Sequence, residues 1–177
     1  SMTSGNTLGR YIGGRTDEPL CQKGIELLQG KCYPKASVIY VSPMRRCVET
    51  AQYIWGEAED LRVVADFREC DFGEFENKSY AELNGRADYQ AWIDSNGEMP
   101  FPGGESRAEF AARCVKAFDE LKKRNLQEDC ALIVHGGTIM AIMEQCAEPA
   151  SDYYSFRVQN GNGYDLYPNG HYEGLLE

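Results

Sequence analysis

Two segments of the chain share one order: a short apolar run, a polar turn and then a helical pattern. The first runs from SVIYVS into PMRRCVETAQYIW at 37–55, and the second from CALIVHGG into TIMAIMEQC at 130–146. Apolar runs without alternation are typical of strands that are buried on both faces, and such strands occur in parallel sheets joined by crossover helices. The sequence therefore predicts an α/β fold in which both strands belong to one mostly parallel sheet.

Three further segments have weaker patterns. LRVVADF at 61–67 predicts another strand, and amphipathic spacing predicts helices at 79–95 and 105–125. Ser79, with Glu82 three residues later, is a typical N-cap for the first of these helices. The fold class is therefore α/β, and we expect a three-layer α/β/α arrangement of these elements.

The C-terminal tail has a different pattern. From Tyr154 onward apolar and polar residues alternate, and the tail contains NGNG at 160–163, a composition typical of hairpin turns. We expect an edge hairpin that turns at this point. No repeat, low-complexity tract or linker-like stretch interrupts the chain, so residues 1–177 are predicted to form a single domain.

Charge and cysteine content limit the partners of the chain. The formal net charge is -10, which repels nucleic acid and anionic lipid over long range. No run approaches the ~18 apolar residues of a membrane span, and no secretory signal pattern is present. The seven cysteines are irregularly spaced, without a CxxC pair or a histidine cluster, which is typical of reduced thiols. We expect a cytoplasmic protein with neither nucleic acid nor membrane as a partner.

Cationic and imidazole side chains follow the two apolar strands. His135 comes directly after one strand, and Gly136 with the next glycine allows backbone N–H groups to approach a ligand there. Arg45 and Arg46 follow the other strand, and a guanidinium fork fits phosphate oxygens. Because ligands of such sheets bind beyond the carboxyl ends of the strands, we expect one shared anion site. His171, in PNGHYEG, is instead predicted to be a solvated turn residue.

An acidic, aromatic loop, FRECDFGEFEN at 67–77, follows the weaker strand. A carboxyl group held near aromatic rings has a raised pKa, which suits a general acid for an alkoxide leaving group. Glu69, Glu74 and Glu76 are the candidates, and the composition of the loop does not choose among them.

Taken together, these segments resemble the histidine phosphatase superfamily, which includes cofactor-dependent phosphoglycerate mutases and alpha-ribazole phosphatases. The resemblance covers nearly the whole chain through five motifs in order: NTLGRYIGGRTDEPLCQKG, SPMRRCVETA, ECDFGEFEN, FPGGES and VHGGTI. The sequences of the segments RYIGGRTDEPL and FPGGES are most similar to the alpha-ribazole phosphatase branch. The resemblance implies a phosphoglycerate mutase-like fold and a phosphomonoester hydrolase that works through a phosphohistidine.

The resemblance also implies roles for individual residues. Glu69, which holds the motif position, is the expected proton donor, and His135 is the expected catalytic imidazole that holds phosphate oxygens. The residues expected to bind phosphate are Arg46, Asn6, Arg10 and Gly136. No metal or cofactor is implied. Departures from the family pattern at Cys47, Phe75 and Asn77 are expected to affect substrate fit more than chemistry.

One part of the family pattern has no counterpart in the chain. The family has Arg-His-Gly at the end of its first, central strand, and that histidine is the nucleophile; aligned on Thr3 and Asn6, both Arg and His fall upstream of Ser1. The expectation is an N-terminally truncated domain that lacks the first central strand, from a misassigned start or a truncated product. Such a chain is expected to be inactive. Either the flanking strands close up or a second molecule fills the gap, and the second option predicts a homo-oligomer.

A second interpretation is a non-catalytic pseudo-phosphatase that binds a phosphorylated ligand or a protein partner. It explains the absent nucleophile, but it gives no reason to keep the proton donor Glu69. If the protein is instead a phosphomonoester hydrolase, its expected ligand is a small phosphorylated metabolite. Its identity stays open, since Phe75, Tyr80 and Trp92 are as compatible with a core as with a substrate pocket.

Overall fold

The computed structural model describes residues 1–56, 60–124 and 129–175. The helices are α1 (Ser4–Thr7), α2 (Gln22–Glu26), α3 (Arg45–Trp55), α4 (Tyr80–Leu83), α5 (Ala87–Asp94), α6 (Arg107–Lys123) and α7 (Gly136–Cys146). Short 3₁₀ turns are η1 (Ala65–Phe67), η2 (Gly73–Phe75) and η3 (Tyr153–Phe156). The strands are β1 (Val38–Val41), β2 (Leu61–Val63), β3 (Cys130–Ile133), β4 (Gly163–Leu166) and β5 (Tyr172–Leu175).

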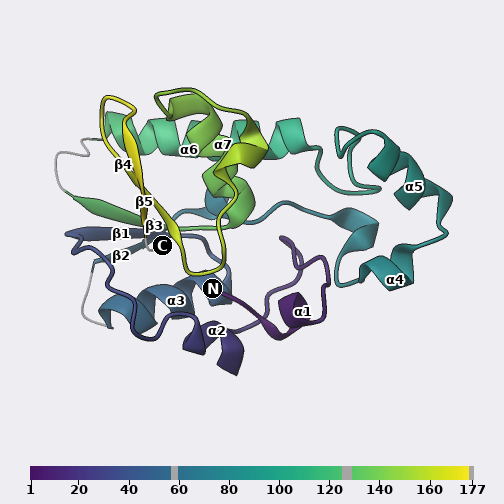
Figure 1. Cartoon of the computed structure of the whole chain (residues 1–177), viewed down its shortest axis with the longest axis horizontal. Helices are drawn as coiled ribbons and strands as arrows, with labels where there is room; N and C mark the ends of the chain where they lie inside the picture. The colour runs from purple at the N-terminus through teal and green to yellow at the C-terminus, as the bar shows by residue number, and fades with distance from the viewer. Residues whose placement is uncertain (57–59, 125–128, 176–177) are drawn as a thin grey trace.

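The main sheet lies between two layers of helices (Figure 1). Its strand order is β2-β1-β3, and both neighbours of β1 run parallel to it. Helices α2 and α3 cover one face and α6 and α7 the other (Figure 1). The predicted three-layer α/β/α architecture with a parallel sheet is therefore confirmed.

Burial of β1 on both faces follows from its apolar sequence. Ile39 and Val41 pack with Cys47 and Ala51 of α3, whereas Tyr40 packs on the opposite face against α6 and α7. Successive side chains of a strand point to opposite faces, so an unbroken apolar run fills two cores at once.

Strand β3 is less buried than its sequence predicts, since all four of its residues are partly exposed. Within the described ranges it pairs with β1 on one edge only, while β4 and β5 form a separate antiparallel sheet. An unpaired edge leaves backbone and side chains accessible.

The helices largely follow the predicted patterns. Ser106 caps α6 in a capping box with Glu109, and Ser79 caps α4 in the same way with Glu82. The predicted helix 79–95 is nevertheless two helices, because Gly85 between α4 and α5 adopts a φ of 86°, outside the helical region. Asn125, the predicted end of the helix at 105–125, lies outside the described residues, as do the last two residues of the tail.

Two other predicted boundaries are wrong. Strand β2 ends at Val63, and the chain then forms η1, which buries Phe67 completely against α6. The predicted tail hairpin exists, but it turns at 167–171 between β4 and β5 and not at NGNG, where Gly163 already begins β4.

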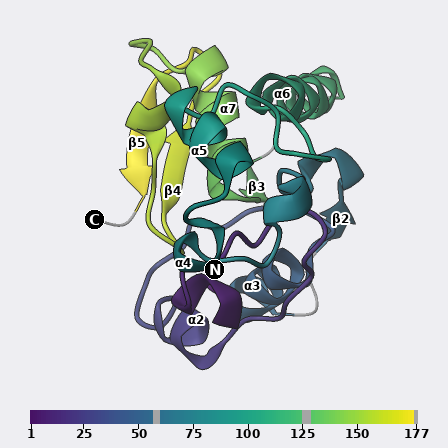
Figure 2. The ribbon, with the colours of Figure 1, turned by 90° about the vertical axis from the view of Figure 1, so that its right-hand side faces the viewer.

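The loops and short helices at the far end of the molecule enclose an aromatic core. Figure 2 views this end, where α4 and α5 lie in front of the sheet. Phe75 and Leu83 are fully buried there, and Phe101 and Phe110 join the same cluster. None of the described helices is long and apolar enough to cross a membrane.

Candidate active site

The carboxyl ends of β1 and β3 meet at one point. Ser42, directly after β1, is fully buried, and its hydroxyl lies 2.7 Å from Nε2 of His135, which caps α7 after β3. The Ser42 amide also donates to the Ile133 carbonyl at 3.0 Å. The two strand ends therefore lie side by side, as the parallel sheet predicts; that they share an anion site stays a prediction.

His135 is a buried imidazole, with 6% of its surface exposed. Its Nδ1 lies 3.7 Å from the nearest carboxylate oxygen of Glu69, and both ring nitrogens lie within 3.8 Å of the Cys47 sulfur. Burial lowers the pKa of His135 well below its ordinary value, and the positive charges of Arg46, the chain's amino group and Arg113 lower it further. The imidazole is therefore neutral at pH 7.

Glu69 is the carboxyl group that faces His135. Its Oε1 accepts a hydrogen bond from the Cys70 amide at 2.9 Å, and 15% of its side chain is exposed. Burial raises the pKa of Glu69 to about 7, although the Cys70 hydrogen bond and the charges of Arg46 and Arg113 oppose this rise. At neutral pH about half of the Glu69 side chains hold a proton that can be donated.

The other two acidic candidates have structural positions. Glu74 is 62% exposed and pairs with Arg86 on the surface. Glu76 accepts hydrogen bonds from the Gly13 amide at 3.1 Å and the Thr16 hydroxyl at 2.5 Å, so it fixes the loop before α2. Of the three, only Glu69 reaches His135.

Arg46 and Arg45 point in different directions. Arg46 is 4% exposed, and its guanidinium donates to the carbonyls of Thr16 at 3.0 Å, Gly13 at 3.3 Å and Ile12 at 3.4 Å. Arg45 pairs with Glu49 at the surface, where 58% of the arginine side chain is exposed. The structure thus places Arg46 inside the site and Arg45 outside it.

The other predicted phosphate ligands, Gly136, Asn6 and Arg10, differ in their exposure and in their hydrogen-bond partners. Gly136 is exposed at the first position of α7, and a Cβ built there would meet no atom within 4 Å. The Asn6 side-chain oxygen accepts from the amide and hydroxyl of Thr3, at 3.0 and 3.1 Å, and so caps α1. Arg10 donates to the Asn77 carbonyl and pairs with Glu82 of α4 at 3.2 Å. Arg10 is thus held at the surface and not among the cluster of Arg46, Glu69 and His135.

Sequence reasoning gave no role to Ser42 or to Arg113. Arg113 of α6 forms a two-pronged ion pair with Glu105, at 2.8 and 2.9 Å, and donates to the carbonyls of Asp66 and Arg68. It thereby fixes the backbone that carries Glu69. Glu105 lies in FPGGES, just before the N-cap residue Ser106 of α6, and Arg113 lies in the second turn of that helix.

A pocket of about 190 Å³ opens beside Glu69. Its walls are mainly aromatic, including Phe72, Trp92 and Phe101, and Gly137 of α7 also lines it. Of the three aromatic residues whose role the sequence left open, only Trp92 lines this pocket. Phe75 is fully buried in the core and Tyr80 is 60% exposed.

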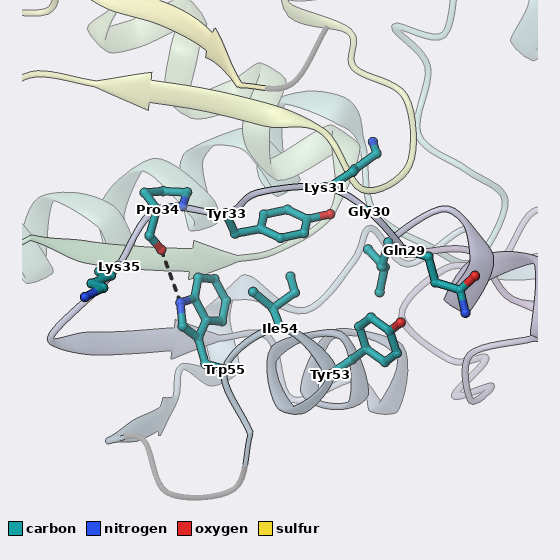
Figure 3. A pocket seen from close by; sticks show the side chains of 10 residues that line it. Gln29, Gly30, Lys31, Tyr33, Pro34, Lys35, Tyr53, Ile54 and Trp55 are labelled. Atoms are coloured by element: carbon teal, nitrogen blue, oxygen red, sulfur yellow. Dashed lines mark hydrogen bonds between the residues drawn. The ribbon is translucent and has the colours of Figure 1, made fainter.

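A second pocket, of about 280 Å³, lies at the other end of α3 (Figure 3). There the Trp55 indole donates to the Pro34 carbonyl at 3.2 Å, and the Tyr33 hydroxyl donates to the Gly161 carbonyl at 2.8 Å (Figure 3 shows the first of these bonds). Because α3 has 11 residues, about 15 Å of helix separate this pocket from the helix start that carries Arg46. It does not belong to the site.

Comparison with known proteins assigns the family. The model of the histidine phosphatase superfamily, branch 1, matches residues 2–173. The chain belongs to the histidine phosphatase superfamily. This finding confirms the resemblance inferred from the five sequence motifs.

Individual members of the superfamily are similar over different parts of their length. Phosphoserine phosphatase 1 of Hydrogenobacter thermophilus is 29% identical over 168 residues, which cover 89% of this chain and 78% of that protein. Phosphoglycerate mutase-like protein 4 of Arabidopsis thaliana is 30% identical over 122 residues, 66% of this chain and 53% of that protein. The chain thus spans between about half and about three quarters of these curated relatives.

Solved structures agree in fold. The alpha-ribazole phosphatase of Shigella flexneri superposes with a TM-score of 0.80 at 22% identity, covering 99% of this chain and 90% of that one. The histidine phosphatase chain therefore has a phosphoglycerate mutase-like α/β fold, as predicted.

Proposed function

We propose that this protein is a phosphomonoester hydrolase that works through a phosphohistidine. The observation that carries the proposal is the cluster of Arg46, Glu69 and His135 at the carboxyl ends of two parallel strands, where Glu69 has a pKa of about 7. An acid that is half protonated at neutral pH, next to a neutral imidazole and a buried guanidinium, suits transfer of a phosphoryl group from an alcohol.

Each residue has a distinct part in the proposed reaction. Arg46, the His135 ring and the backbone N–H groups at the start of α7 hold the phosphoryl oxygens, and the positive end of the helix dipole favours their charge. A nucleophilic imidazole attacks phosphorus while the bond from phosphorus to the alcohol oxygen breaks. Glu69 gives its proton to the departing alkoxide. A water molecule then attacks the phosphohistidine and returns a proton to Glu69 as inorganic phosphate forms.

The nucleophile in this proposal is a histidine that precedes Ser1. The sequence contains two histidines. His135 is engaged with Ser42 and Glu69, and His171 lies 57% exposed beside Glu173 in the hairpin. In-line displacement requires a defined approach that neither ring has.

The open edge of the main sheet supports the same proposal. Strand β3 has a free edge within the described residues, and the amino group of Ser1 lies near enough to His135 to lower its pKa. A preceding strand that pairs with β3 would end in the site, where it would deliver a catalytic side chain. The 177-residue chain alone is then expected to turn over phosphomonoesters negligibly while it still binds phosphate.

Two proteins test the proposal: the 177-residue chain, and a version extended upstream with a strand that ends in Arg-His-Gly. Hydrolysis of a generic aryl phosphate is measured in the presence of a metal chelator, and binding of inorganic phosphate is measured by calorimetry. Turnover by the extended protein alone, lost again on Glu69→Gln, is the expected result. Phosphate binding without turnover by either protein would favour the pseudo-phosphatase interpretation, and neither binding nor turnover would overturn the proposal.

A further inference from the structure

The pocket beside Glu69 has the chemistry of a binding site for an aromatic ring. Phe72 and Phe101 lie 4.9 Å apart between ring centroids, and Trp92 lies 4.9 Å from Phe101 with the two rings tilted by 31°. Phe110 and Tyr153 complete the apolar wall. Aromatic walls favour a further ring, because offset and edge-on contacts between rings add to the burial of apolar surface.

The size of the pocket fits one ring. It encloses about 190 Å³. A cavity of about 150 Å³ with apolar walls is large enough to bind benzene. The small polar groups of a serine or glycerate ester would leave much of this volume unfilled. The guanidinium of Arg107, which also lines the pocket, lies over the Tyr153 and Tyr154 rings.

The pocket begins at the proton donor. Glu69 and Gly137 line it, and a Cβ built on Gly137 would lie 3.3 Å from Oε1 of Glu69 and 2.8 Å from the Phe110 ring. An alcohol oxygen that takes a proton from Glu69 therefore lies at the pocket entrance. The organic part of the same alcohol extends into the pocket, since the phosphoryl group occupies the side of Arg46 and His135.

We propose that the alcohol released by this enzyme carries a single aromatic ring, which fills the pocket beside Glu69. This inference rests on the proposed function, because it places the leaving group relative to Glu69. It also separates the substrate from the small, polar esters that the names of the phosphoserine phosphatase and phosphoglycerate mutase relatives suggest.

Calorimetry with three alkyl phosphates tests the inference without requiring turnover. The probes are ethyl phosphate, O-phosphoserine and 2-phenylethyl phosphate, and inorganic phosphate serves as reference. The phenyl compound is expected to bind about 10- to 50-fold more tightly than ethyl phosphate, from burial of one ring.

Two variants assign this gain to the pocket. Phe101→Ala and Trp92→Ala should each weaken binding of the phenyl compound about 10-fold and leave inorganic phosphate unaffected. Because Trp92 is only partly buried, Trp92→Ala decides the inference if Phe101→Ala fails to fold.

The outcomes distinguish this inference from the proposed function. Tight binding of inorganic phosphate with no preference for aromatic esters would overturn the inference and leave the phosphatase proposal in place. Binding of 2-phenylethanol but of no phosphate would overturn the phosphatase proposal and support the ring pocket. Preference for O-phosphoserine over the phenyl compound would overturn the inference directly.

Discussion

Replacing Glu69 with glutamine should change the pH dependence of stability in a defined direction. The pKa of Glu69 is about 7 in the folded chain, against an ordinary value of 4.5. Since the folded-state pKa is the higher one, the folded protein holds this proton more tightly than the unfolded chain does. The contribution of Glu69 to the free energy of unfolding is fully present below pH 4.5 and is lost as the pH rises through 7.

The size of the effect follows from the same values. Each pH unit between the two pKa values corresponds to about 1.4 kcal/mol, so the full loss is about 3 kcal/mol. Glutamine has no charge to bury at any pH, so the variant does not lose this stability as the pH rises. Between pH 5 and pH 8 the free energy of unfolding of Glu69→Gln should therefore rise by about 2 kcal/mol relative to that of the wild-type protein.

Urea unfolding of both proteins at pH 5 and pH 8 measures this difference. Other titrating groups occur in both proteins, so most of their effect cancels in the comparison. Glu74→Gln is the matched control, because Glu74 is 62% exposed and pairs with Arg86 at the surface, where such pairs contribute under about 1 kcal/mol. An equal stability difference between wild type and Glu69→Gln at both pH values would refute the assignment of Glu69 as a buried acid.

Three further predictions concern single residues. In the upstream-extended protein, kcat should fall about tenfold for each pH unit above about 7 as Glu69 loses its proton, and a pH-rate profile that stays flat to pH 9 would contradict the assigned proton donor. Arg46→Met should weaken inorganic phosphate binding at least tenfold and destabilise the fold by about 1–3 kcal/mol, since three carbonyls lose their donor; calorimetry and urea unfolding measure both effects, and unchanged phosphate affinity would contradict the assigned site. Burial raises the pKa of the Cys47 thiol to about 11, so mass spectrometry after maleimide labelling at pH 7.5 should find the exposed Cys32 modified first and Cys47 unmodified; rapid labelling of Cys47 in the folded protein would be inconsistent with its buried position.

The meeting of Arg46 and His135 could be predicted from sequence because it follows from sheet geometry. Two unbroken apolar runs, each followed by a helix, require a parallel sheet, and parallel strands end at the same edge. The capping box of Ser79 could also be predicted, because it depends only on Glu82 three positions later; the box of Ser106 with Glu109 has the same spacing but was not predicted.

Other features depend on contacts that spacing does not encode. Arg45 and Arg46 are neighbours of the same residue type, so the sequence alone does not show which of them is buried. In the structure Arg46 donates hydrogen bonds to carbonyls of the loop at 12–16. Likewise, the Gly13 amide and the Thr16 hydroxyl bind the Glu76 carboxylate, whereas Glu69 faces His135. The predicted hairpin turn was misplaced because Asn-Gly pairs occur both at 160–163 and at 169–170 in the tail, and local turn chemistry favours a turn at either place.

The aromatic pocket and the raised pKa of Glu69 have one cause. The site excludes water from this carboxyl group, and the rings around the neighbouring pocket extend the same apolar surroundings. A ring that fills the pocket would remove more water from Glu69 and stabilise its protonated form further. The leaving alcohol oxygen needs a proton from Glu69. A substrate whose ring fills the pocket would therefore raise the fraction of enzyme in which Glu69 is protonated and can donate that proton. Affinity for the leaving group and the protonated fraction of Glu69 would then depend on the same buried surface. A phosphate ester of a small polar alcohol would bind more weakly and would leave Glu69 less protonated.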